Sequence, residues 1–285
     1  MRYEAPDTIK AAVGLLSKAK GTSRILAGGT DLLVQMRSGM IEPDLVVDIK
    51  SIPGMREIVA EKGGYRIGAA VSGAELEEHG KVGKMWPGVV EATNLIGSTQ
   101  IQGRATMVGN LCNASPAADS VPAMIAAGAT ARVVGPKRTR DVPVEDIAKA
   151  PGKTSLAKGE FVASIFLPKA PARTGSAYLR FIPRTEMDIA VVGAGIALTV
   201  NAKGVITAAK VSLGAVAARA LVVDACAKAI IGSSLDDEAL DRLAAAASAA
   251  AKPISDKRGT VDFRIKVAGV LARRAAVIAY DRARG

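Results

Sequence analysis

The alternation of apolar and polar positions in the first fifty residues predicts a small βαβ unit. Ile9, Ala12, Val13 and Leu16 recur on one helical face behind Asp7, which is the expected N-cap. Beyond this helix, the pattern predicts a strand at 24–27, a helix at 32–37 and a second strand at 45–48. A strand, a helix and a strand in this order are typical of a parallel pair with a crossover.

The middle of the chain mixes helical and strand signals, which favours an α+β class. Residues 75–103 read as helical with a break at Pro87–Gly88, and 123–127 as a short apolar helix. Residues 103–122 are rich in small and polar side chains and carry little periodicity, so a loop is expected there. The expected strands lie at 65–67, 131–134 and 161–167.

The segment 168–175 is the best linker in the chain because it combines proline, glycine and charge. Three strands are expected beyond it, at 177–181, 189–200 and 205–213. Ser234 with Asp237 predicts a capping box before an Ala-rich helix, and a last helix is expected at 263–282. We therefore expect one domain at 1–172, in halves of about 1–52 and 53–172, and a second at 173–285.

Composition narrows the possible chemistry. The 285 residues are 49% hydrophobic and 23% charged, which is typical of a globular protein. No apolar run is long enough for a transmembrane segment, and the N-terminus has no signal-peptide core. With two cysteines and one histidine, the chain is not expected to build an iron–sulfur or structural zinc site. Any demanding chemistry would then come from an organic cofactor.

Two glycine-containing segments are candidate phosphate-binding sites. Leu26–Leu32 places Gly28 and Gly29 between an expected strand and an expected helix, where backbone N–H groups can face an anion. Thr106–Asn110, followed by a polar stretch that ends in Asp119, is the second. An ordinary turn and a surface loop remain the alternatives, since short glycine motifs occur often.

A third glycine segment is interpreted as a core strand. Val191–Ala197 resembles the opening of a dinucleotide-binding fingerprint, but Leu198 occupies the sixth position and a turn follows in place of a helix. His79, Cys112, Cys226 and Trp86 are interpreted as structural. Lys137–Arg140 is either a solvated hairpin tip or a docking patch.

The two candidate segments, taken together, resemble the FAD-binding subunits of the molybdenum hydroxylases, the carbon monoxide dehydrogenase and xanthine dehydrogenase type. The similarity continues at 161–168, 178–181, Arg184, 188–190, 214–217 and 273–275, and so covers nearly the whole chain. It implies a vanillyl-alcohol-oxidase-type FAD-binding domain in two halves, then a C-terminal three-stranded sheet with helices.

The resemblance also implies roles for named residues. One group would enclose the FAD pyrophosphate: Ile25, Leu26, Ala27, Gly28, Gly29, Thr30, Asp31, Leu32, Thr106, Met107, Val108, Gly109 and Asn110. Ile96 would lie near the flavin or the adenine, Asp119 would bind a cofactor hydroxyl, and Val162 would contact the cofactor through its backbone. Arg180 would sit near the flavin ring, where its charge favours the reduced anion. No catalytic residue and no metal ligand is expected on this chain.

Val108 departs from the family pattern, which has glycine at this position. If the glycine supplies backbone flexibility, valine would weaken FAD binding; if the side chain points away, nothing changes.

The function implied by the resemblance is electron transfer. A large subunit would carry the molybdenum cofactor, a small subunit would carry [2Fe-2S] clusters, and FAD on this chain would pass electrons to an external acceptor. The expected assembly is a dimer of heterotrimers in the cytoplasm, associated with a membrane only through the complex. The alternatives are a free-standing FAD oxidoreductase and, given a net charge of +11, a nucleic-acid-binding protein. Few aromatic residues and no recognisable nucleic-acid motif argue against the last.

Overall fold

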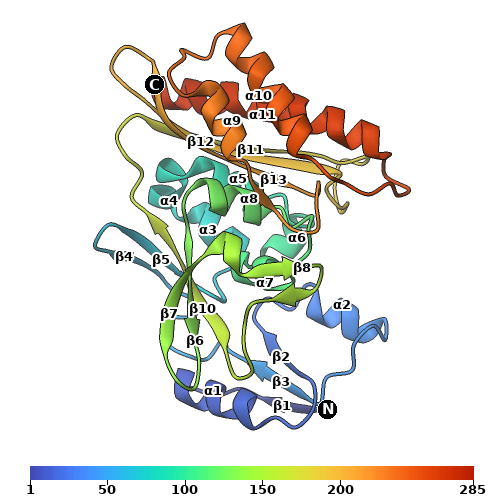
Figure 1. The fold of residues 1–285 in the computed structure, drawn as a ribbon. Helices are drawn as coiled ribbons and strands as arrows, with labels where there is room; N and C mark the ends of the chain where they lie inside the picture. The colour runs from blue at the N-terminus through green and yellow to red at the C-terminus, as the bar shows by residue number, and fades with distance from the viewer.

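The computed structural model describes residues 1–285, and its N-terminal residues form the expected parallel unit (Figure 1). Three parallel strands pair in the order β1-β3-β2. The elements are β1 (Arg2–Glu4), α1 (Ile9–Lys18), β2 (Ser23–Leu26), α2 (Leu32–Arg37) and β3 (Leu45–Asp48). The expected cap of α1 was wrong by one residue, because Thr8 and not Asp7 accepts the N–H of Ala11 at 3.2 Å.

A five-stranded antiparallel sheet follows, with the order β4-β5-β10-β6-β7. Its strands are β4 (Ile58–Glu61), β5 (Gly64–Gly68), β6 (Thr130–Val134), β7 (Thr139–Pro143) and β10 (Phe161–Pro168). The last strand in sequence, β10, lies between β5 and β6. A small hairpin of β8 (Ala148–Ala150) and β9 (Lys153–Thr154) precedes it, after a short 3₁₀ turn at Val144–Asp146.

Six short helices fill the stretch between β5 and β6. They are α3 (Gly73–Glu78), α4 (Gly80–Met85), α5 (Pro87–Thr93), α6 (Thr99–Gln102), α7 (Met107–Cys112) and α8 (Ser120–Ala126). The loop expected at 103–122 was wrong, because it contains α7 and the start of α8. The helix α7 has six residues including Gly109 and Asn110, which are poor helix formers, so no periodic signal marks it.

The C-terminal part is an antiparallel sheet covered on one face by helices (Figure 1). The sheet has three long strands, which are β11 (Thr174–Phe181), β12 (Val192–Val200) and β13 (Ile206–Gly214). A fourth strand of two residues, β14 (Leu221–Val222), pairs with β13. The helices are α9 (Asp224–Ile230), α10 (Asp237–Ala250) and α11 (Val261–Arg284). The segment 191–197 lies largely on β12 and is buried, as predicted. The expected cap Ser234 was wrong, since Asp236 accepts the N–H of Ala239.

The other face of this sheet packs directly on α5 and α8 (Figure 1). Glycines make the contact close. A Cβ at Gly195 would lie 2.6 Å from the backbone of Pro122, and one at Gly88 would lie 2.8 Å from the backbone of Ala177. No helix of the structure combines the length and the apolar character needed to cross a bilayer.

The substitution Gly195→Ala should lower the free energy of unfolding by roughly 1–3 kcal/mol, because its methyl group overlaps backbone atoms that cannot move away. Gly14→Ala is the matched control. Its Cβ would meet nothing within 4 Å on α1, so it should raise stability by about 0.5–1 kcal/mol. Urea unfolding checks both; equal effects of the two variants would contradict the close contact.

Candidate functional site

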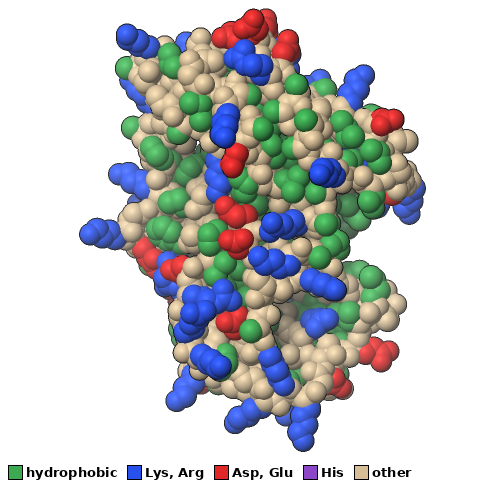
Figure 2. Space-filling model, in the orientation of Figure 1, with side chains coloured by type: hydrophobic (Ala, Val, Ile, Leu, Met, Phe, Trp, Pro, Cys, Tyr) green, Lys and Arg blue, Asp and Glu red, His purple; other side chains and the backbone are tan.

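A cavity of about 660 Å³ lies between the parallel N-terminal unit, the start of α7 and the loop before β10. Figure 2 shows the surface hollowed between the body of the molecule and the lobe that carries α2. The volume falls within the range of roughly 300–1,000 Å³ that is usual for small-molecule sites.

The cavity collects most of the residues that the sequence singled out. Thirteen of the seventeen line it: Ile25, Ala27, Gly28, Gly29, Thr30, Asp31, Leu32, Ile96, Thr106, Val108, Gly109, Asn110 and Val162. The remaining four, which are Leu26, Met107, Asp119 and Arg180, do not form part of its lining.

The two glycine segments meet through their backbones. A Cβ at Gly28 would lie 1.9 Å from the carbonyl oxygen of Arg104 and 3.3 Å from the Cα of Ala105. Gly29 has a φ of +80°, a conformation that other residues rarely adopt. The two glycines therefore let the turn after β2 lie directly against the approach to α7.

The second segment is a capped helix start. Thr106 accepts the N–H of Gly109 at 2.9 Å through its hydroxyl, and Ala105 accepts the N–H of Gly73 at 2.8 Å. Asn110 accepts the backbone N–H of Ser120 at 3.1 Å and its hydroxyl at 2.7 Å. These bonds fix the floor of the cavity to α3 and to the first turn of α8.

Sequence reasoning missed 18 of the 31 lining residues, and most of these belong to two groups. One consists of Gln35, Met40 and Ile41, on α2 and just after it. The other is the segment 152–161, which follows β8 and leads into β10. Gly152 and Gly159 in this segment have φ values of +68° and +84°, so paired glycines before a strand were the available signal.

Comparison with known proteins connects this chain with a cofactor. Residues 1–170 match the family described as the FAD binding domain in molybdopterin dehydrogenase. Residues 177–278 match the CO dehydrogenase flavoprotein C-terminal domain. The chain belongs to this family. FAD is therefore its cofactor. The cavity fits such a group because Gly28, Gly29 and the start of α7 line it, and glycines without side chains let a pyrophosphate approach the backbone closely.

Relatives match over two thirds of the chain or more. The carbon monoxide dehydrogenase medium chain of Afipia carboxidovorans is 33% identical over 282 residues, which is 99% of this chain and 97% of that one. The xanthine dehydrogenase FAD-binding subunit of Escherichia coli O157:H7 is 32% identical over 67% of this chain and 66% of its own length. These relatives are oxidoreductase subunits.

Solved structures of such enzymes share the fold. A chain of the Cu,Mo-CO dehydrogenase superimposes with a TM-score of 0.94 at 32% identity, covering 99% of this chain and 98% of that chain. A chain of quinoline 2-oxidoreductase from Pseudomonas putida 86 gives 0.92 at 26% identity, covering 100% and 98%. The expected FAD-binding fold with a C-terminal sheet and helices is confirmed.

Val108, the departure from the family pattern, has an ordinary helical backbone. It is the second residue of α7, its φ is not positive, and it is 5% exposed within the hydrophobic core. The backbone at this position is therefore accessible to valine without strain.

Asp119 and Arg180 form a buried ion pair between the two parts of the chain. Arg180 donates to one carboxylate oxygen of Asp119 at 2.8 Å, and the hydroxyl of Tyr178 donates to the other at 2.9 Å. The two charged side chains are 5% and 10% exposed. Burial raises the pKa of Asp119 to about 6, although Arg180 and Tyr178 both favour its charged form.

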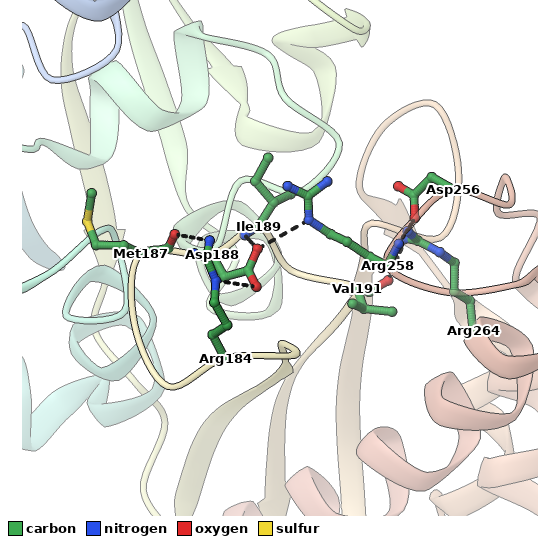
Figure 3. A network of polar contacts seen from close by, with 8 residues as sticks. All are labelled: Arg184, Met187, Asp188, Ile189, Val191, Asp256, Arg258 and Arg264. Atoms are coloured by element: carbon green, nitrogen blue, oxygen red, sulfur yellow. Dashed lines mark hydrogen bonds and ion pairs between the residues drawn. The ribbon is translucent and has the colours of Figure 1, made fainter.

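A second polar network holds the loop between β11 and β12 (Figure 3). Arg184 and Arg258 donate to opposite oxygens of Asp188 at 3.3 and 3.2 Å, and the N–H of Ile189 adds a bond of 2.8 Å. The backbone N–H and both arginines lower the pKa of Asp188 to about 2. Arg258 precedes α11, so this network fastens the loop to the C-terminal helices.

Val108→Gly should not strengthen FAD binding, although it restores the family residue. It should lower the free energy of unfolding by about 1–3 kcal/mol, because it removes a buried side chain from a helix. Val277→Gly is the matched control. It also places a glycine inside a helix, α11, but the side chain that it removes is half-exposed and not buried. FAD titration and urea unfolding test this; a several-fold tighter FAD complex of Val108→Gly would contradict it.

Asp119→Asn should change how stability depends on pH. A carboxyl group with a pKa of about 6 in the folded state, against about 3.9 in the unfolded state, binds its proton more tightly when folded. Its stabilising contribution is present below about pH 4 and is lost as the pH rises through 6. The difference in unfolding free energy between the wild-type and Asp119→Asn proteins should therefore fall by about 1–3 kcal/mol from pH 4 to pH 7. Unfolding of the cofactor-free proteins measures it, and a constant difference is the contrary result.

Proposed function

We propose that this chain is the FAD-binding electron-transfer subunit of a molybdenum-containing hydroxylase or dehydrogenase. FAD bound here receives electrons from [2Fe-2S] clusters of a small partner subunit and delivers them to an external acceptor. A large partner subunit carries the molybdenum cofactor. The observation that supports this most is the cavity that both glycine segments line, in a chain that matches FAD-binding medium subunits from end to end.

The residues that hold the cofactor are proposed from the lining. Backbone N–H groups of Gly28–Asp31 and Thr106–Val108 bind the pyrophosphate. Gly109 and Asn110, whose N–H groups bond to Thr106, line the site beside it, and Ile96 and Val162 contact the remaining parts of the cofactor. Asp119 and Arg180 act at the edge of the site. Asp119 neutralises most of the charge of Arg180. The pair therefore acts on the cofactor with the field of a dipole and not with that of a full positive charge.

The proposal includes the assembly and the division of the chain. Two hydrophobic clusters, one mostly within residues 1–172 and one within 173–285, support two domains. The net charge of +11 supports docking of acidic partner subunits. The assembly proposed with them is a dimer of heterotrimers in the cytoplasm.

The experiment is to co-express this chain with the large and small partner subunits. The complex is then reduced by its substrate in the absence of oxygen. We expect this chain to carry FAD, with loss of the visible flavin band at a rate that keeps pace with turnover. In the isolated chain, the same substrate should leave the flavin oxidised. Reduction of the isolated chain by substrate would instead identify a free-standing FAD oxidoreductase, and salt-sensitive DNA binding by a colourless protein would favour the nucleic-acid alternative.

A further inference from the structure

One wall of the FAD cavity is attached far more weakly than the others. This wall, residues 30–38, includes all of α2 and is called the α2 wall below. Leu32 and Gln35 line the cavity, yet α2 has no buried residue. On the opposite side, Leu33 and Val34 are 53% and 64% exposed. Figure 1 shows α2 projecting from the body of the molecule, and apolar side chains are visible on that lobe in Figure 2.

The hydrogen bonds of the α2 wall remain almost entirely local. Its backbone bonds connect Gly29 to Leu33, Asp31 to Gln35, and Val34 to Ser38. One side-chain bond leaves the segment, from Nε2 of Gln35 to Oδ1 of Asn113 at 3.0 Å. Asn113 caps the end of α7, so this bond connects the α2 wall to the opposite side of the cavity.

A glycine with positive φ stands at each end of the α2 wall. Gly29 has a φ of +80° and Gly39 a φ of +72°, and a Cβ at Gly39 would meet nothing within 4 Å. Glycine backbones of this kind absorb rotations at little steric cost. A segment with few buried contacts between two such residues belongs to the least stable part of a fold.

We propose that the α2 wall is a hinged gate of the FAD cavity, and that Gln35 and Asn113 are positioning residues that latch it. Bound FAD holds the gate closed, because Leu32 and Gln35 line the cavity and would contact the cofactor only when the gate is closed. Opening breaks one side-chain hydrogen bond and exposes little apolar surface. This inference rests on the proposed function, since it requires FAD in this cavity.

The first test measures FAD release from the loaded full-length protein by stopped flow. Gln35→Ala and Asn113→Ala should each release FAD roughly five- to tenfold faster, as expected for loss of one hydrogen bond. The double variant should be no faster than either single variant, because both changes remove the same bond. Gln100→Ala is the matched control: this exposed glutamine of α6 does not line the cavity, and release should not change. Additive effects of the two substitutions would overturn the latch.

The second test is amide hydrogen exchange of the α2 wall with and without FAD. Exchange at 30–38 should slow at least tenfold when FAD binds, and should accelerate in cofactor-free Gln35→Ala. A purely structural role for Gln35 would change neither FAD association nor local exchange, whereas an unlatched gate increases both.

The failure of the gate can be told from the failure of the proposed function. FAD titration of the same samples comes first. If FAD binds and protects residues 104–110 while 30–38 exchange at an unchanged rate, the gate is overturned and the cofactor site stands. If no FAD binds, both proposals fail.

Discussion

The absence of a side chain at Gly28 is the constraint on which the glycine-lined cavity depends. With the position of a Cβ only 1.9 Å from the carbonyl oxygen of Arg104, no other residue fits without separating the two segments. The parallel unit at the N-terminus and the helices before β6 are distant in sequence, and this contact brings them together. The usual explanation of such a glycine is close approach of a phosphate. Here, contact between the two protein segments already requires it.

The C-terminal sheet stabilises the residues at the floor of the cavity. Asp119 lies one residue before Ser120, which Asn110 holds by two hydrogen bonds at the cavity floor. The carboxylate of Asp119 is itself held by Tyr178 and Arg180 from β11. Removing the pair from water is costly, and it persists because both oxygens of the carboxylate are bonded. The position of Asn110 in the cavity lining is therefore connected with the C-terminal sheet.

The sequence predicts the elements whose signals are local. The helix at Leu32–Arg37 and the strand at Leu45–Asp48 have the predicted bounds, since glycines and an apolar run mark them. The segment 191–197, which resembles a dinucleotide-binding fingerprint, was placed in a strand because Leu198 occupies the sixth position and a turn follows it. Thirteen of the 31 residues that line the cavity were also singled out, because the glycine content of both segments is a local signal.

Other features depend on tertiary contacts that no local pattern records. The helix α7 needs the cap at Thr106 and its packing to form, and six residues are too few for periodicity. The N-caps of α1 and α10 lie one and two residues after the predicted positions. Several polar side chains compete there for the same N–H groups. The pairing of Gln35 with Asn113 spans 78 residues, and the partner of Arg180 lies 61 residues away. Neither pairing follows from spacing along the chain.

The walls of the cavity therefore differ in how far each depends on bound FAD to hold its position. The contact of Gly28 with Arg104 and the bonds of Asn110 are made between protein groups alone, so the floor needs no cofactor contact to hold its shape and costs little to use. The segment after Gly29 is held by one bond, and ordering it takes part of the binding free energy. A site of this kind binds more weakly than its contacts alone imply, and it gains affinity from anything that holds α2 in place. Stability should rise with FAD concentration by mass action, and most of the ordering should occur at α2.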